Sequence, residues 1–268
     1  MPLFKHPLVW FLLLLLPLGA CSVRPGESEP DVIVTVPPEF VVDLYEQRAA
    51  ADGQPSFGLW VETVKTDYPS GNYRIVSEVE SGASRVVVRL LDVAAPDQPD
   101  GTAGPARTFI PVGTLADGVY NFTVQLAETL FSEGTLTVDQ GRYELAFPDG
   151  TAGIDVQNRV LQHIPDGTVW GYVLTPSEIQ YPAANNFLLN IKDFTTEPDL
   201  APGYYGYFTV AGTGQVFFHR SVAPGVLSQP FLRHLTADPN GLRGLIDTYR
   251  SDAQTPLTIR CWSTGGEL

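Results

Sequence analysis

Basic side chains are scarce in this sequence of 268 residues. Lysine and arginine together number 16, against 30 aspartates and glutamates, which gives a formal net charge of −14. A surface with this balance repels the phosphates of nucleic acids, so we do not expect nucleic-acid binding. The excess of acid is consistent with three properties, which stay open: solubility, adaptation to salt, and calcium binding through carboxylate oxygens.

Residues that usually bind metals or carry catalysis are also few. The four histidines stand far apart, at positions 6, 163, 219 and 234. None has an HExxH or HxH spacing, and the sequence contains no CxxC pair, no GxSxG motif and no glycine-rich phosphate loop. We therefore expect no metal and no cofactor. A hydrolase remains an alternative if its site is assembled in space, as a concave pocket lined either by two carboxylates or by His219 and His234 with an acid.

No apolar run is long enough to cross a membrane as a helix. The longest, residues 8–18 after Lys5, is shorter than the roughly 20 residues that a spanning helix needs. Its length instead suits the apolar core of a signal peptide. Leu18-Gly19-Ala20-Cys21 follows directly and resembles the lipobox of bacterial lipoproteins. The position after an apolar run makes these four residues more specific than they would be alone.

The lipobox resemblance implies export and a lipid anchor. Residues 1–20 would be the signal peptide, cleaved before Cys21, and Cys21 would be acylated on its sulfur and on its new amine. Its acyl chains would hold the protein to a lipid bilayer, since each buried CH₂ adds about 0.8 kcal/mol. Ser22, in place of the aspartate that resembles an inner-membrane retention signal, favours the outer membrane. Both its periplasmic face and the cell surface stay open.

A flexible tether and a hydrophobic core are expected after the anchor. Residues 21–31 are polar and rich in proline, glycine and acid, which is typical of a tether. If Cys21 carries lipid, Cys261 has no disulfide partner, and the body depends on its own core. Leu257, Ile259 and Cys261 alternate on one strand face, so we expect a buried, inert thiol.

Period-two alternation predicts a mainly β protein with two tandem β-sandwich domains. The first sandwich is expected over 32–147, a linker over 148–153, and a second β-rich domain over 154–268. In the first domain the expected strands are 32–36, 57–64, 72–79, 85–91, 108–112, 119–126, 134–138 and 142–147, with 39–51 either a helix or an edge strand. In the second they are 154–161, 168–174, 187–194, 204–210, 215–220 and 257–262.

A helical insert is expected near residues 230–250 of the second domain. Asp238 suits a helix N-cap, and Pro239 suits the first helical position. The apolar residues that follow, Leu242, Leu245, Ile246 and Tyr249, have the i, i+3, i+4, i+7 spacing of one helix face. A short helix over 231–235 would come before it.

Residues 115–122, Leu-Ala-Asp-Gly-Val-Tyr-Asn-Phe, resemble the start of the sixth strand of immunoglobulin-like domains. The resemblance implies that Tyr120 forms a tyrosine corner, with its hydroxyl bonded back to the backbone. Phe122 stands where antibody domains carry a cysteine. A similar sequence motif recurs at residues 200–207, which suggests that the two halves of the chain are related domains.

Aromatic residues of the second half are the remaining functional signal. The ligand-binding candidates are Tyr204, Tyr205, Tyr207, Trp170 and Trp262, and the competing interpretation is aromatic packing in the core. We predict a non-enzymatic binding or assembly lipoprotein at the cell envelope, whose partner is a protein or a glycan. The alternatives are a polysaccharide-binding accessory lipoprotein that uses these aromatics, and the hydrolase described above.

Overall fold

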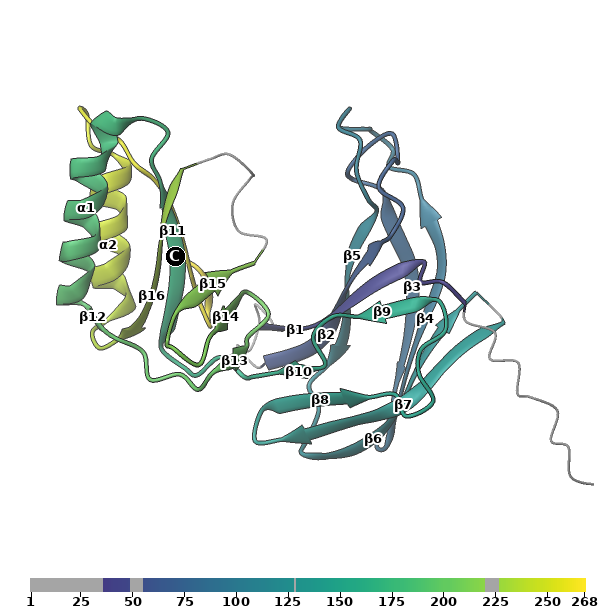
Figure 1. Ribbon diagram of the computed structural model, residues 1–268. Helices are drawn as coiled ribbons and strands as arrows, with labels where there is room; N and C mark the ends of the chain where they lie inside the picture. The colour runs from purple at the N-terminus through teal and green to yellow at the C-terminus, as the bar shows by residue number, and fades with distance from the viewer. Residues whose placement is uncertain (1–35, 49–54, 128, 220–226) are drawn as a thin grey trace, which may run out of the picture. The chain divides into compact units, whose positions relative to one another are not determined.

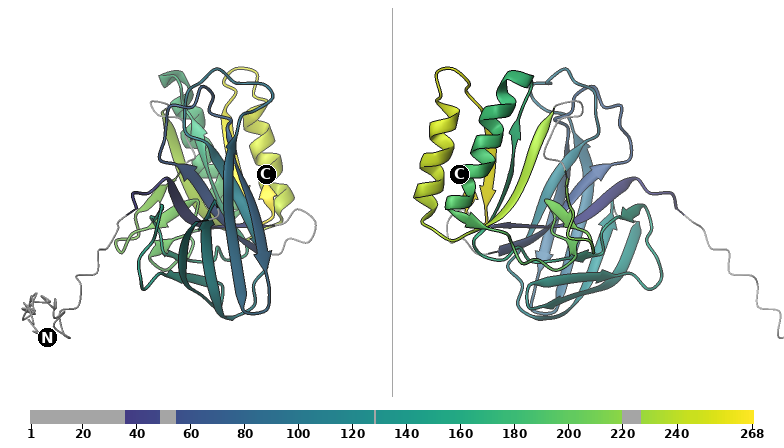
Figure 2. Two further views of the ribbon diagram at one scale, coloured as in Figure 1. Left: turned by 90° about the vertical axis from the view of Figure 1, so that its right-hand side faces the viewer. Right: turned by 60° about the vertical axis from the view of Figure 1, so that its left-hand side comes forward.

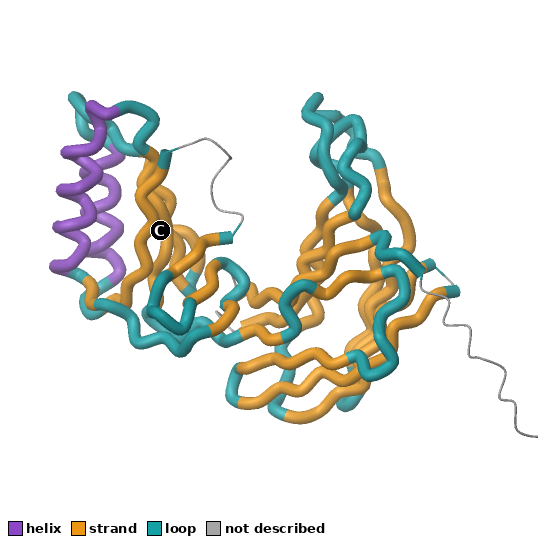
Figure 3. The backbone as a smooth tube through the Cα atoms, in the orientation of Figure 1, coloured by secondary structure: helices purple, strands orange, loops and turns teal. Residues whose placement is uncertain are grey.

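Strands dominate the computed structural model, as expected for a mainly β protein (Figures 1 and 3). The structure describes residues 36–48, 55–127, 129–219 and 227–268, which belong to one compact unit, Val36–Leu268. The expected signal peptide, Cys21, the tether and nearly all of the strand expected at 32–36 lie outside the described residues.

Two sheets form the first half of the described chain. The four-stranded sheet has the order β5 (Arg107–Gly113), β2 (Pro55–Thr63), β1 (Phe40–Arg48) and β9 (Ile154–Val156). The six-stranded sheet has the order β10 (Val160–Leu161), β8 (Arg142–Ala146), β7 (Leu130–Asp139), β6 (Gly118–Leu126), β4 (Arg85–Ala94) and β3 (Arg74–Ser81). The ambiguous segment 39–51 is thus a strand over its described part. Pairing is antiparallel except between β1 and β9 and between β4 and β6.

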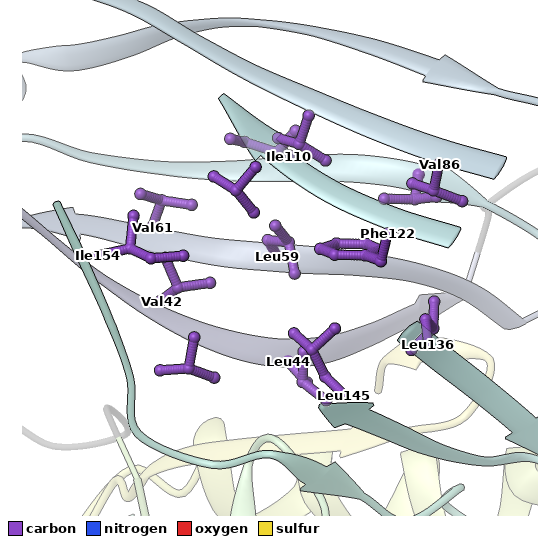
Figure 4. Packing of buried hydrophobic residues seen from close by; sticks show 14 of the residues in the cluster. Val42, Leu44, Leu59, Val61, Val86, Ile110, Phe122, Leu136, Leu145 and Ile154 are labelled. Carbon is purple, nitrogen blue, oxygen red and sulfur yellow. The ribbon is translucent and has the colours of Figure 1, made fainter. Parts of the chain in front are cut away.

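Alternate residues of both sheets form one core between them (Figure 4). Val42, Leu44 and Leu59 of the four-stranded sheet are buried, and Phe122 and Leu145 of the six-stranded sheet are buried with them. Each such side chain contributes about 1.5–3 kcal/mol when it leaves water. These contacts make residues 40–161 a β-sandwich.

The sandwich continues past its expected end. The amides of Glu39 and Phe40 donate to the carbonyl oxygen of Gly153, at 2.8 and 3.2 Å, inside the expected linker 148–153. β9 then pairs with β1, and β10 with β8. Residues 154–161, expected to begin the second domain, therefore complete the first sandwich. A turn-rich segment marks a change of direction, but it does not show which sheet the next strand joins.

The second half has three layers (Figures 1 and 2). Its five-stranded sheet has the order β12 (Thr195–Thr196), β16 (Ser228–Leu235), β11 (Thr168–Leu174), β17 (Thr258–Ser263) and β18 (Gly266–Glu267). One face is covered by α1 (Tyr181–Asn190) and α2 (Pro239–Arg250), with the short 3-10 helices η1 (Glu178–Gln180) and η2 (Ile191–Asp193) beside α1. The other face is covered by β13 (Gly203–Tyr204), β14 (Phe208–Val210) and β15 (Val216–Phe218). A second sandwich built of strands alone is therefore not what the described residues form.

The two helices differ in how well the sequence predicts them. α2 is confirmed: it begins at Pro239, and the Asp238 carboxylate accepts from the amide of Asn240 at 3.0 Å. The strand expected at 187–194 is wrong, because α1 and η2 occupy it. Ala184, Phe187 and Ile191 recur at i, i+3 and i+7 and are buried together, which is helical spacing. The short helix expected at 231–235 is wrong as well, since β16 extends through it.

β11 separates two cores because its side chains alternate between the faces of the sheet. Val169 and Val173 pack against the helices, together with Cys261. Trp170 packs on the opposite face with Phe208. Cys261 is fully buried, and this burial raises the pKa of its thiol to about 12. The expectation that the thiol is buried is confirmed.

Candidate ligand-binding site

Three of the five aromatic candidates line one pocket. The pocket has a volume of about 260 Å³, and its lining consists of aromatic or apolar side chains and a polar rim: Trp170, Tyr207, Trp262 and Ile164, with Glu46, Gln47, Ser263, Thr264, Gly266 and Glu267. We call it the aromatic pocket. Gln47 and Glu267 are exposed, which places the pocket at the surface.

Strand pairing brings the two tryptophans together. Trp170 of β11 is the direct cross-strand partner of Trp262 of β17, so both project from the same face of the sheet. The ring of Tyr207 lies 4.9 Å from that of Trp170 and 4.7 Å from that of Tyr45, measured between centroids. Contacts on both sides hold the Tyr207 ring in place. Burial also raises the pKa of Tyr207, so its hydroxyl stays protonated at neutral pH.

The polar side of the pocket includes a buried carboxylate. The side chain of Glu46 on β1 is only 3% exposed, and its Oε2 lies 2.8 Å from Nδ1 of His163. A buried carboxylate is costly unless it is hydrogen-bonded, and His163 supplies that bond. Glu267, at the rim, accepts from Nη1 of Arg260 at 2.7 Å. The pocket therefore contains the two carboxylates that the hydrolase alternative requires, and each of them has a basic side chain beside it.

The indole N–H of Trp170 is an exception to normal hydrogen bonding. It is buried, and it has no acceptor among the residues that the structure describes. Buried donors without a partner are rare in folded proteins. Trp170 is a lining residue of the pocket, and packing against Tyr207 and Phe208 fixes its indole ring.

The other two aromatic candidates lie in the hydrophobic cores and do not line the pocket. Tyr204 is 7% exposed and packs with the sandwich core, whereas Tyr205 is 3% exposed and stacks on Phe208. Burial raises the pKa of Tyr205. Alternation alone could not separate them from Tyr207, because β13 ends at Tyr204 and β14 begins only at Phe208.

The histidines are arranged differently from the expected acid/histidine site. Nε2 of His219 lies 2.7 Å from the Thr209 hydroxyl, and His234 lies on β16 beside Gly167. Neither lines the aromatic pocket. His163 is the histidine that reaches a pocket residue, and sequence spacing gave no signal for it, since it stands 117 residues from Glu46.

The acidic loop near Asp100 has a structural role. Its carboxylate accepts from the Ser70 hydroxyl at 2.6 Å and from the amides of Gly71 and Thr102, and these bonds lower the pKa of Asp100. Over the described ranges, no group of three or more histidine, cysteine, aspartate or glutamate side chains has an arrangement that could hold a metal ion.

Neither helix of the described chain has the length and apolar composition needed to cross a membrane. Comparisons of the chain with protein-family models, with curated proteins and with solved structures gave no match.

Proposed function

We propose that this chain is a bacterial lipoprotein whose body is a non-enzymatic binding protein at the outer membrane. The lipobox-like residues 18–21 after an apolar run support export and acylation at Cys21. The compact unit begins at Val36, which leaves residues 22–35 between the acylated cysteine and the folded body. The tether expected from the composition of residues 21–31 would let the body reach a partner near the membrane.

The observation that carries the binding function is the aromatic pocket. Trp170, Tyr207 and Trp262 supply apolar surface, and a few polar groups surround them. Small-molecule sites commonly combine these features, with polar groups that fix the orientation of the ligand. Glu46 and Glu267 are engaged by His163 and Arg260, which suits carboxylates held for recognition.

We also propose that the sandwich over residues 40–161 is immunoglobulin-like. Support comes from Tyr120 on β6, the sixth of the described strands, whose hydroxyl donates to the carbonyl oxygen of Ala116 at 2.8 Å. This is the hydrogen bond of a tyrosine corner. The parallel pairing of β4 with β6 distinguishes the sandwich from a wholly antiparallel one.

Mass spectrometry of the membrane fraction tests the anchor. We expect the wild-type protein to begin at an acylated Cys21, and the Cys21→Ala variant to be a soluble or uncleaved precursor. Cys261→Ala is the matched control: it removes the other cysteine, which is buried, and should leave acylation unchanged. An unmodified wild-type chain that runs uncut through residue 21 would overturn the proposal.

A further inference from the structure

We infer that the aromatic pocket binds a single sugar ring of a neutral glycan. The inference deepens the proposed binding function and rests on it. It is drawn from the apolar walls of the pocket, its buried carboxylate, its charge pairing and its size.

The walls of the pocket suit one face of a sugar ring. A pyranose presents C–H groups on its faces and hydroxyls around its edge, so a flat aromatic surface covers the faces while polar groups meet the edge. Trp262 and Tyr207 are half-buried and offer their rings to the pocket. Trp170 is only 4% exposed and supports them from below: it is the cross-strand partner of Trp262, and its ring centroid lies 4.9 Å from that of Tyr207. Tryptophan and tyrosine side chains suit this contact because they join a large apolar face to a polar tip.

The carboxylate of Glu46 can accept a hydrogen bond from a ligand. Within the described part of the chain, its hydrogen bond is the one from His163 to Oε2. The second oxygen, Oε1, remains to accept from a ligand hydroxyl. Because packing and His163 fix this side chain, which is only 3% exposed, little conformational entropy is lost on binding.

The charge pairing favours a neutral ligand over a cation. Nη1 of Arg260 lies 2.7 Å from Oε1 of Glu267 at the rim, so the Glu267 carboxylate already has a positively charged partner. The amide of Gln47 and the hydroxyl of Thr264 present both donors and acceptors, whereas the Ser263 hydroxyl already donates to the carbonyl oxygen of Gly266. A sugar hydroxyl also does both, whereas an ammonium group only donates.

The size of the pocket limits the ligand to one ring. Its volume of about 260 Å³ is just below the roughly 300–1,000 Å³ typical of drug-sized ligands. A terminal or branching sugar would enter, and the rest of the glycan would remain in solvent.

Saturation-transfer NMR and titration calorimetry test the inference. The full lipidated protein is held in a detergent without sugar headgroups and titrated with methyl glycosides of glucose, galactose, mannose and xylose. Choline and lysine methyl ester serve as cationic probes. We expect at least one glycoside to bind at millimolar concentration and the cations not to bind. If none of the glycosides binds, the inference is overturned.

Variants place the sugar in the pocket. Trp262→Ala should weaken binding about tenfold, which corresponds to about 1.4 kcal/mol. Trp262→Phe keeps an aromatic face and should restore part of the affinity. Phe217→Ala is the control, because it removes an aromatic ring that is 48% exposed on β15, outside the pocket. Binding by folded Trp262→Ala with wild-type affinity would overturn the inference.

The outcomes separate the two proposals. If a cation binds and Trp262→Ala abolishes that binding, the proposed binding function is supported and the inference of a neutral sugar ligand is overturned. If Cys21 is acylated but no probe binds, the lipid anchor is supported and the sugar inference is overturned. Sugar binding by a chain that is not acylated would support the pocket and contradict the lipoprotein assignment.

Discussion

The hydroxyl of Tyr205 donates to the carbonyl oxygen of Ala201 across 2.8 Å, four residues earlier in the chain. Tyr120 makes the same bond to Ala116 at the same distance. Both tyrosines are buried, although one lies in the sandwich and the other lies beside the five-stranded sheet. The sequence motif that recurs at residues 115–122 and 200–207 therefore encodes a local turn. It does not encode two copies of one domain, since the strands around the two turns are arranged differently.

Tyr120→Phe and Tyr205→Phe should each lower the free energy of unfolding by about 1 kcal/mol, the usual net value of one hydrogen bond. Ala116 and Ala201 are exposed, so water can satisfy the freed carbonyl groups. Denaturant unfolding of the single and double variants measures the losses, which should add because the two turns share no partner. Tyr181→Phe is the control, as no hydrogen bond of its hydroxyl occurs in the described chain, and it should change nothing.

Gly171→Ala should destabilise the protein by several kcal/mol. A Cβ at this position of β11 would overlap the carbonyl oxygen of Arg260 and come within 2.8 Å of Cζ of Phe231. The backbone of the central strand would have to move, because another strand approaches glycine closely here. Thermal unfolding with circular dichroism measures the effect.

Gly244→Ala is the matched control for that prediction. Gly244 lies inside α2, and a Cβ there would meet no atom within 4 Å. Alanine is favoured over glycine in helices by about 0.5–1 kcal/mol, so this variant should be more stable than the wild type. Equal losses in the two variants would contradict the close strand contact at Gly171.

Cys261 should be unreactive toward thiol reagents until the protein unfolds. Burial raises the pKa of its thiol from the ordinary 9.0 to about 12, so the folded state favours the protonated form. The resulting stability is fully present below about pH 9 and is lost as the pH rises toward 12. Denaturation measured from pH 8 to 11 should show a steeper decline for the wild type than for Cys261→Ala, which lacks the titrating group.

Asp238→Ala should lower the free energy of unfolding by about 1 kcal/mol, because it removes the carboxylate that caps α2 by accepting from the amide of Asn240. Asp238→Asn keeps an oxygen acceptor and should retain most of the stability. Urea unfolding of the two variants gives the comparison. A loss of equal size in both would show that the negative charge matters more than the capping bond.

The mainly β character, most strands of the first half and helix α2 were predictable, because they follow from local periodicity and capping. Strand pairing was not predictable, since nothing within residues 154–156 says that β9 joins β1. α1 was missed even though Ala184, Phe187 and Ile191 show helical spacing, because the mostly apolar segment 187–191 also suits a strand. The sequence indicates Trp170, Tyr207 and Trp262 as candidates, but their placement beside Glu46 depends on contacts between distant segments.

The parallel pairing of β1 with β9 has a consequence for how the chain matures. β1 lies inside its sheet between β2 and β9, so one edge of this strand, the first among the described residues, stays open until β9 near the end of the sandwich has been synthesised. Closing such distant contacts is slow, because a long loop must be ordered first. A nascent chain of this design remains unfolded for longer, which would suit the export proposed above, because a secretion channel threads an unfolded chain.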